Sequence, residues 1–149
     1  MPRSLDQRRE AALERLAASR QLWLATGGGR GGVHLIPVSY AWNGTVLTTA
    51  TFVRSRTTAN IRADPRVRAA IGETTDVTMV DATATLVGVE EIDAKSADAY
   101  ARVSLDPRVT PGFHYVRLVP QRIQVWSGVQ EFAGRTVMSG GEWLDKPID

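Results

Sequence analysis

Two arginines and two hydroxyl side chains are consecutive near the middle of the chain, at Arg54, Ser55, Arg56 and Thr57. A guanidinium group can donate two parallel hydrogen bonds to a phosphate or a carboxylate, and hydroxyl groups can donate beside it. The residues before this stretch are β-branched or aromatic, as in a strand, and those after it can form a helix whose first N–H groups lack partners. The stretch therefore predicts an oxyanion site at a strand-to-helix turn, with a basic surface turn that binds nothing as the alternative.

The elements on either side of this turn follow from local signals. Residues 48–53 are predicted to end a strand, and residues 58–63 to form a short helix. The helix should stop at Asp64, because the residue before a proline is driven out of the α region, and Arg66 and Val67 should open the next strand. The oxyanion turn would thus be held between two strands.

Two further helices are predicted. Ser4 and Gln7 have the spacing of a capping box, which predicts a helix over residues 5–19. Asp93 is predicted to cap a helix that runs from residue 94 to about residue 103. Strand patterns occupy most of the remaining chain, at 21–26, 33–42, 46–53, 68–73, 77–92, 113–119 and 122–126. Many strands, few helices and no regular βαβ alternation favour a mainly β fold with peripheral helices, built as a small barrel.

Glycine, asparagine and proline mark the connections. Asn43-Gly44 predicts a hairpin that pairs the strand containing Pro37 with the strand at 46–53. Because proline cannot donate to a ladder, Pro37 should lie on an edge strand, at a bulge, or where the backbone faces a ligand. The glycines of residues 27–32 are predicted to form a hairpin tip and not a phosphate loop, because a strand and not a helix follows them.

Composition excludes several classes of function. The 149 residues suit one domain, residues 1–149, with the helix at its start and a tail over residues 127–149. There is no cysteine and there are two histidines, which argues against disulfides, thiol nucleophiles and a metal site. A net charge of +2 with dispersed arginines argues against nucleic acid, and the short apolar runs argue against a membrane, so we expect a cytoplasmic protein. No triad or carboxylate pair is recognisable, so any chemistry should belong to a bound cofactor.

The central stretch also resembles a known family. Its pattern is S-R-x-x-x-N-[LI], two residues, then D-P-R-V, formed by Ser55, Arg56, Asn60, Ile61, Asp64, Pro65, Arg66 and Val67. This pattern is similar to the cofactor-phosphate segment of the pyridoxamine 5'-phosphate oxidase-like split-barrel flavoproteins, which carry FMN or the deazaflavin coenzyme F420. The segment VWSGVQEFAGRTVMSGGEWL at residues 125–144 resembles the end of one branch of that superfamily. The resemblance implies a split β-barrel and a homodimer with the cofactor between subunits.

The resemblance also implies where a cofactor would be held. Its matching positions place the strand around Pro37 beside the flavin ring, with Ser39 able to hydrogen-bond a ring heteroatom. The family often has lysine and arginine where this chain has Thr57 and Ala59, so the phosphate charge would be met by Arg56, Arg54 or Arg62. Arg66 would widen a basic groove if it converged with these three. The expected cofactor-binding residues are Pro37, Val38, Ser39, Thr49, Ala50, Thr51, Arg54, Ser55, Arg56, Thr57 and Asn60.

The function implied is that of an F420-dependent oxidoreductase that transfers hydride to an electron-poor double bond of a small organic substrate. The alternatives are an FMN-binding oxidoreductase of the pyridoxamine 5'-phosphate oxidase type and a non-catalytic module that binds flavin or haem. Iron could be ligated only by His34 or His114, the two histidines of the chain. No catalytic residue is assigned, and by residue type alone the candidates for proton donation are His34, Tyr40, His114 and Tyr115. The aromatic residues Trp126, Phe132 and Trp143 are expected in the core or at the dimer interface.

Overall fold

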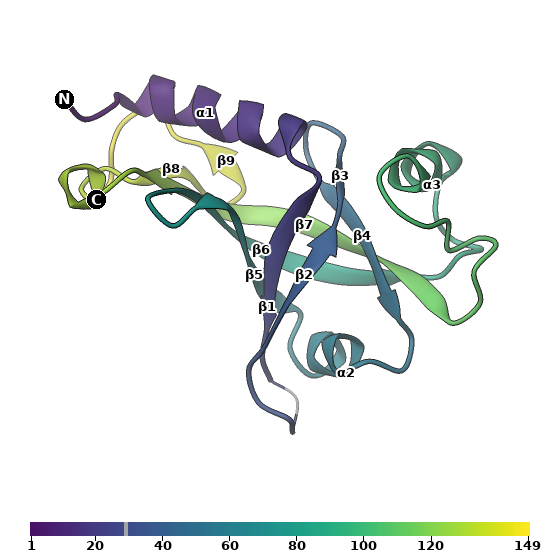
Figure 1. The fold of residues 1–149 in the computed structure, drawn as a ribbon. Coiled ribbons are helices and arrows are strands. Elements are labelled where there is room, and N and C mark those ends of the chain that lie inside the picture. Colours follow the sequence, from purple (N-terminus) through teal and green to yellow (C-terminus); the bar gives the residue numbers. More distant parts are fainter. Residues whose placement is uncertain (29) are drawn as a thin grey trace.

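A computed structural model describes residues 1–28 and 30–149, and these form a curved antiparallel sheet with helices around it (Figure 1). The strand order is β2-β1-β5-β6-β7-β4-β3, and β8 and β9 continue from β7. The strands are β1 Gln21–Thr26, β2 His34–Ser39, β3 Ala41–Trp42, β4 Leu47–Phe52, β5 Arg66–Glu73, β6 Asp76–Val87, β7 Phe113–Trp126, β8 Thr136–Ser139 and β9 Glu142–Trp143. The helices are α1 Leu5–Ala18, α2 Arg56–Ala63, α3 Ala94–Ala101 and the short 3-10 helix η1 Val129–Glu131. The predicted mainly β fold with peripheral helices is confirmed.

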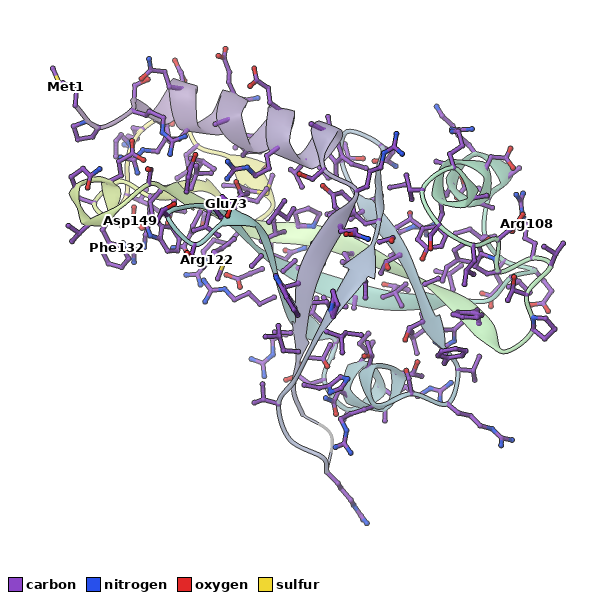
Figure 2. The ribbon with its side chains drawn as sticks, in the orientation of Figure 1. Met1, Glu73, Arg108, Arg122, Phe132 and Asp149 are labelled. Carbon is purple, nitrogen blue, oxygen red and sulfur yellow. The ribbon has the colours of Figure 1, made fainter. Side chains whose placement is uncertain are left out.

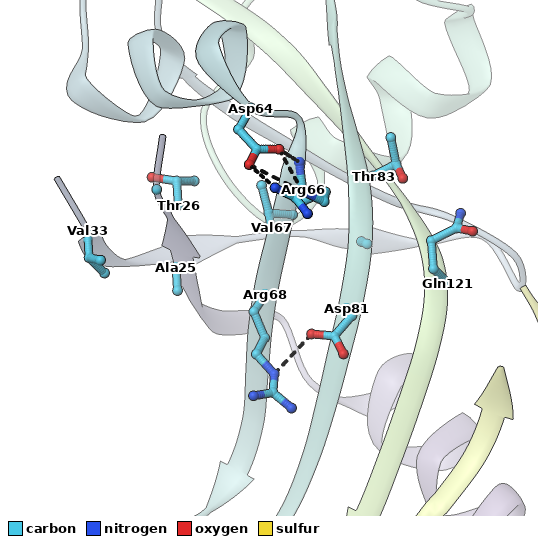
Figure 3. A pocket seen from close by; sticks show the side chains of 12 residues that line it. Ala25, Thr26, Val33, Asp64, Arg66, Val67, Arg68, Asp81, Thr83 and Gln121 are labelled. Atoms are coloured by element: carbon cyan, nitrogen blue, oxygen red, sulfur yellow. Dashed lines mark hydrogen bonds and ion pairs between the residues drawn. The ribbon is translucent and has the colours of Figure 1, made fainter. Parts of the chain in front are cut away.

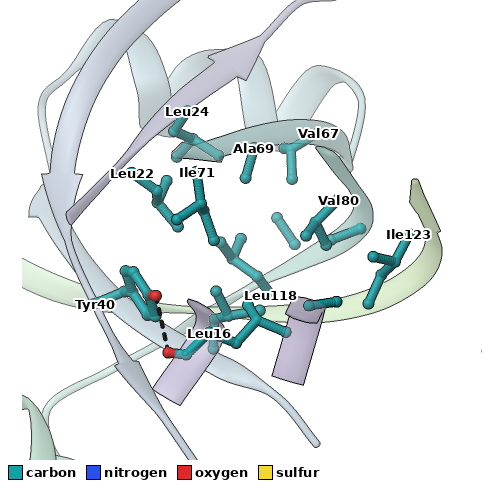
Figure 4. Close-up of a cluster of buried hydrophobic side chains, with 14 of the residues drawn as sticks. Leu16, Leu22, Leu24, Tyr40, Val67, Ala69, Ile71, Val80, Leu118 and Ile123 are labelled. Atoms are coloured by element: carbon teal, nitrogen blue, oxygen red, sulfur yellow. Dashed lines mark hydrogen bonds between the residues drawn. The ribbon is translucent and has the colours of Figure 1, made fainter. Parts of the chain in front are cut away.

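The main core lies on the concave side of the sheet, where α1 closes it (Figure 4). Alternate residues of β5 point inward, so that Val67, Ala69 and Ile71 are buried between less buried neighbours. Leu16 of α1 is fully buried against them, and its carbonyl accepts a hydrogen bond of 2.9 Å from the Tyr40 hydroxyl. This bond joins the end of α1 to the chain between β2 and β3.

A second, smaller cluster lies under α3. It contains Ala50 of β4, Val87 of β6, Tyr115 of β7, and Ala97 and Tyr100 of α3. The rings of Tyr100 and Tyr115 meet edge to face, with centroids 6.1 Å apart. The two clusters lie on opposite faces of β4, since consecutive side chains of a strand point to opposite faces.

The predicted N-terminal helix is confirmed, and it ends at Ala18, one residue earlier than expected. Its capping box is present, because the Ser4 hydroxyl accepts from the Gln7 backbone N–H and the Gln7 side chain accepts from the Ser4 backbone. The helix is also tied to the end of the chain by Arg8, which is buried and donates to the carbonyls of Val125, Glu131 and Ala133.

The prediction of a single strand over residues 33–42, paired with 46–53, is wrong. The strand is divided at Tyr40, whose backbone N–H donates to the Arg20 carbonyl, and its first part, β2, pairs with β1 so that Pro37 lies opposite Trp23. Only the second part, β3, pairs with β4. The Asn43-Gly44 hairpin therefore exists, but it joins β3 to β4 through a wider turn in which the Asn43 side chain accepts two backbone N–H bonds. Pro37 is on a strand at one end of the sheet order, as predicted for an edge strand.

Other boundaries differ from the predictions by a few residues. Strand β6 ends at Val87 and not at residue 92, although its alternating burial agrees with the prediction. The two closing strands are one strand, β7, that continues through Pro120. A bulge accompanies the proline, because Asp81 pairs with Arg122 and the next residue, Ala82, pairs with Pro120, so that Gln121 is the extra residue. Helix α3 ends at Ala101 and not near residue 103.

Candidate functional site

The predicted strand-to-helix turn is present between β4 and α2. Strand β4 ends at Phe52, and α2 begins at Arg56, two residues earlier than the sequence suggested. The earlier start follows from Ser55, which is the N-cap and whose Oγ accepts a 3.1 Å hydrogen bond from the Thr58 backbone N–H. The side chains of Arg54 and Arg56 are exposed on this turn.

A chain of hydroxyl groups holds the turn from the inside. Ser55 Oγ lies 3.1 Å from Thr51 Oγ1 and 3.1 Å from Thr58 Oγ1. Thr58 Oγ1 donates to the Phe52 carbonyl at 2.8 Å and lies 2.9 Å from His114 Nε2. Because Thr51 and His114 are paired across β4 and β7, this chain fastens the start of α2 to two strands of the sheet.

His114 is part of the site in a way that the sequence did not indicate. Its side chain is buried, and burial, followed by the nearby charge of Arg62, lowers its pKa below the ordinary value for histidine. The ring is therefore neutral at pH 7. The sequence placed His114 only among the candidates by residue type, since Thr58 is 56 positions away and no local spacing links the two.

The glycine-rich connection between β1 and β2 lies against α2 and forms the other wall of a cavity of about 590 Å³. Arg30 and Gly31 line it from the connection, and Ser55, Arg56 and Asn60 line it from the turn and the helix. A Cβ atom added at Gly31 would collide with the Arg56 guanidinium, so the absence of a side chain lets the two segments meet. The prediction of a hairpin tip agrees with the β1–β2 pairing. The sequence did not indicate that this connection also forms a cavity wall. Gly29 lies outside the described residues.

Asn60 connects the two walls of this cavity. It is buried, and its Nδ2 donates to Thr26 Oγ1 at 3.1 Å and to the Gly32 carbonyl at 3.1 Å. From the sequence, Asn60 is expected only as one of the cofactor-binding residues. In the structure it joins the two ends of the glycine-rich connection and so holds this cavity wall beside α2.

The remaining predicted residues are not all brought to this cavity. Thr57 is buried inside α2, and the side chain of Ala50 belongs to the core cluster under α3. Arg66 forms an ion pair of 2.7 Å with Asp64, whose pKa it lowers to about 2, and it lines a different pocket (Figure 3). The expected convergence of Arg66 with the arginines of the α2 turn is therefore not observed.

The residues expected beside the flavin ring lie on β2. Pro37 is exposed, while Val38 points inward against the core. The carbonyl of Ser39 accepts a 2.6 Å hydrogen bond from Thr49 Oγ1, which joins the end of β2 to β4. Thr49 and Thr51 lie on the same face of β4. Thr49 contacts the end of β2, and Thr51 contacts Ser55 in the turn before α2, so this face of β4 connects the two segments.

The convex face of the sheet carries a broad apolar surface. A pocket of about 630 Å³ is bordered by Arg66, Arg68, Asp81 and Gln121 (Figure 3). A neighbouring pocket of about 320 Å³ is lined mainly by apolar side chains, namely Trp23, Ala25, Leu35, Ala69, Ala70 and Met79, with Arg68. Trp23 is 52% exposed and Leu35 is 58% exposed, and because both line this pocket they form one contiguous exposed apolar surface.

Over residues 1–28 and 30–149, no group of three or more histidine, cysteine or acidic side chains is arranged to hold a metal ion. In the same part of the chain, no helix has the length and apolar character needed to span a membrane.

Comparison with known proteins identifies one family and several solved structures of similar fold. A family model described as pyridoxamine 5'-phosphate oxidase matches residues 9–127. An F420 reductase of known structure has 21% identity and a TM-score of 0.56, over 76% of this chain and 94% of that chain. A haem-binding protein from Mycobacterium smegmatis has 19% identity and a TM-score of 0.67, over 95% of this chain and 60% of that chain. A FAD-binding protein from Mesorhizobium loti has 18% identity and a TM-score of 0.63, over 77% of this chain and 89% of that chain. No curated protein matches the chain.

The family match confirms the predicted split-barrel fold. At these identities the structural likenesses concern the fold alone. The cofactor that a split barrel of this kind binds depends on its own residues.

Proposed function

Because the chain belongs to the pyridoxamine 5'-phosphate oxidase family of flavin-binding split barrels, we propose that it is an oxidoreductase that uses coenzyme F420. The proposed reaction is hydride transfer to an electron-poor double bond of a small organic substrate. When bound, the deazaflavin would supply the hydride chemistry. The protein would bind the anionic tail, orient the ring and exclude water.

The observation that carries this proposal is the cavity between α2 and the glycine-rich connection. Arg56 lines it from the helix and Arg30 from the opposite wall, so cations from two segments border one space of about 590 Å³. The tail of F420 carries several acidic groups, whereas FMN ends in a single phosphate. Two separated cations suit a tail with more than one charge, because each can meet a different anionic group.

The similarity of fold to an F420 reductase agrees with the proposal. The similarity to a FAD-binding protein and to a haem-binding protein agrees with the alternatives, in which the chain binds another flavin or haem. For haem, the geometry is unfavourable at His114, because its Nε2 is already within 2.9 Å of Thr58 Oγ1 in a buried position. FMN bound through the same turn is the alternative enzyme. A module that binds F420 without turnover is the alternative outside the enzyme class.

We propose further that residues 1–149 form one domain and that two copies form the functional unit. Helix α1 packs on the sheet, and the tail after residue 127 pairs with β7 through β8, so the ends of the chain belong to the same core. The broad apolar convex face supports a homodimer, since an isolated subunit would leave it exposed to water. A cofactor site shared between subunits follows from the family resemblance.

Titration of the apoprotein with F420 and with FMN at the same salt concentration tests the proposal directly. Tight binding of F420 and weaker binding of FMN is the expected result, because the longer acidic tail of F420 offers a separate anionic group to each of Arg30 and Arg56. Preferential binding of FMN would transfer the proposal to the alternative enzyme. Tight binding of F420 without oxidation of the reduced coenzyme by any electron-poor alkene would favour the non-catalytic module.

A further inference from the structure

The hydrogen bonds around Thr58 determine where its neighbours carry their protons. Thr58 Oγ1 has one proton, and the Phe52 carbonyl 2.8 Å away can only accept it. Thr58 Oγ1 must therefore accept from its two other neighbours, Ser55 Oγ at 3.1 Å and His114 Nε2 at 2.9 Å. This arrangement requires the proton of the neutral imidazole to be on Nε2.

The hydrogen bonds of Ser55 determine the direction of its hydroxyl proton in the same way. Its Oγ accepts from the Thr58 backbone N–H at 3.1 Å and from Thr51 Oγ1 at 3.1 Å, and it donates its own proton to Thr58 Oγ1. Of the four side chains in this chain of hydrogen bonds, Thr51, Thr58 and His114 are each at most 8% exposed. Ser55 is half-buried and lines the cavity beside Arg56. Its proton is thus the one that can be redirected towards a ligand.

We propose that His114 is a positioning residue that allows the Ser55 hydroxyl to turn from Thr58 to an oxyanion held by Arg56. When Ser55 turns away, Thr58 Oγ1 loses one donor but keeps the His114 Nε2–H, so no buried hydroxyl oxygen is left without a partner. Without His114, the same rotation would leave Thr58 Oγ1 with no donor in a buried site. The inference rests on the proposed function, since it concerns how the same cavity receives the anionic tail.

Leucine and glutamine substitutions at His114 separate this role from simple packing. His114→Leu fills the space without a donor, whereas the amide of His114→Gln can replace the Nε2–H. We expect His114→Leu to weaken binding of F420 by about fivefold, the ordinary effect of one neutral hydrogen bond, and His114→Gln to stay within about twofold of the parent. Thermal unfolding of each variant confirms that the measurements refer to folded protein.

A double-mutant cycle with Ser55→Ala tests the route of the effect. If His114 acts through the Ser55 hydroxyl, His114→Leu causes no further loss of binding once that hydroxyl is absent. An equal loss in both backgrounds would overturn the inference. So would nitrogen NMR of the apoprotein that shows the neutral His114 ring protonated on Nδ1. Failure of the parent to bind F420 or FMN would instead overturn the proposed function, whereas normal binding by both the parent and His114→Leu would remove only the role of His114.

Discussion

At the residue scale, Arg56 differs from the neighbouring arginines in what surrounds its guanidinium. It lines the cavity and lies against the backbone at Gly31, so it faces the glycine-rich wall and not bulk solvent alone. Arg66, by contrast, is engaged with Asp64, to which it donates hydrogen bonds of 2.7 to 3.2 Å. Arg54 and Arg62 do not line the cavity, so Arg56 is the arginine of this segment best placed to bind an anion there.

Replacing Arg56 by alanine should weaken F420 binding by about tenfold to a hundredfold, the range expected for one or two charge-assisted hydrogen bonds. Folding should be nearly unchanged, because an exposed arginine on a turn has little packing to lose. Arg108→Ala is a control for binding alone, since Arg108 is a surface arginine that lies after α3, away from α2, and is paired with Asp98 and Asp106 (Figure 2). Isothermal titration of the three proteins makes the comparison.

Two outcomes would contradict this assignment. Parent-like binding by Arg56→Ala, with weak binding by Arg54→Ala or Arg62→Ala, would show that another arginine meets the phosphate. Parent-like binding by all three variants would mean that the turn is only a connection between β4 and α2.

At the scale of elements, α1 and the C-terminal tail are held together by a network around Glu131. Its carboxylate accepts from the Arg3 side chain at 2.7 Å and from the backbone N–H of Ser127 at 2.8 Å. Chiefly because of the hydrogen bond from Arg3, the pKa of Glu131 is lowered to about 2 from an ordinary 4.5. Since Arg8 of α1 also donates to the Glu131 carbonyl, the same residue joins helix and tail twice.

This network predicts a pH dependence of stability. A carboxyl group with a lowered pKa in the folded state stabilises the protein above its unfolded pKa, and this contribution is lost as the pH falls from about 4.5 to about 2. Glu131→Gln should lower the free energy of unfolding at pH 7 by roughly 1 to 3 kcal/mol and reduce the loss of stability over that acidic range. Urea unfolding between pH 7 and pH 2 provides the measurement.

Glu142→Gln on β9 is the control, because Glu142 is exposed and its substitution should change little. An identical acid dependence for the parent and Glu131→Gln would show that the network does not couple α1 to the tail.

At the scale of the whole molecule, the convex face and the C-terminal aromatics behave differently. Trp126 and Phe132 meet edge to face with centroids 5.8 Å apart, and the Arg9 guanidinium lies over Trp143, so each of these aromatics has a partner within the subunit, although Phe132 is 47% exposed. Trp23 and Leu35, on the convex face, stay half or more exposed. The convex face is therefore the stronger candidate for the interface between copies.

Leu35→Glu should convert the expected dimer into a monomer, because each interface would bury two added carboxylates, and the neighbouring Arg68 is already paired with Asp81. Sedimentation equilibrium at micromolar concentration measures the change. Val109→Glu is a suitable control, since Val109 is 79% exposed in the loop after α3, away from this face. A parent protein that is already a monomer would remove both the dimer and the site shared between subunits.

The structural features that the sequence predicted well depend on neighbouring residues. The capping box at Ser4, the alternating burial of β6 and the strand-to-helix turn before α2 each arise from interactions within a few positions, so their signals are local. The pattern around Ser55 and Arg56, on which the family resemblance rests, predicted the fold for the same reason, because it consists of neighbouring residues in one strand-to-helix turn.

The tertiary structure alone determined which strands pair and which segments border the cavity. The pairing of β1 with β5, the bond between His114 and Thr58, and the closure of the glycine-rich connection on α2 join segments far apart in the chain. Such contacts depend on how the core aligns whole strands, and a shift of one residue would turn each side chain to the opposite face. The residue types of the cavity were therefore visible in the sequence, whereas their meeting around one space was determined by the packing of the sheet.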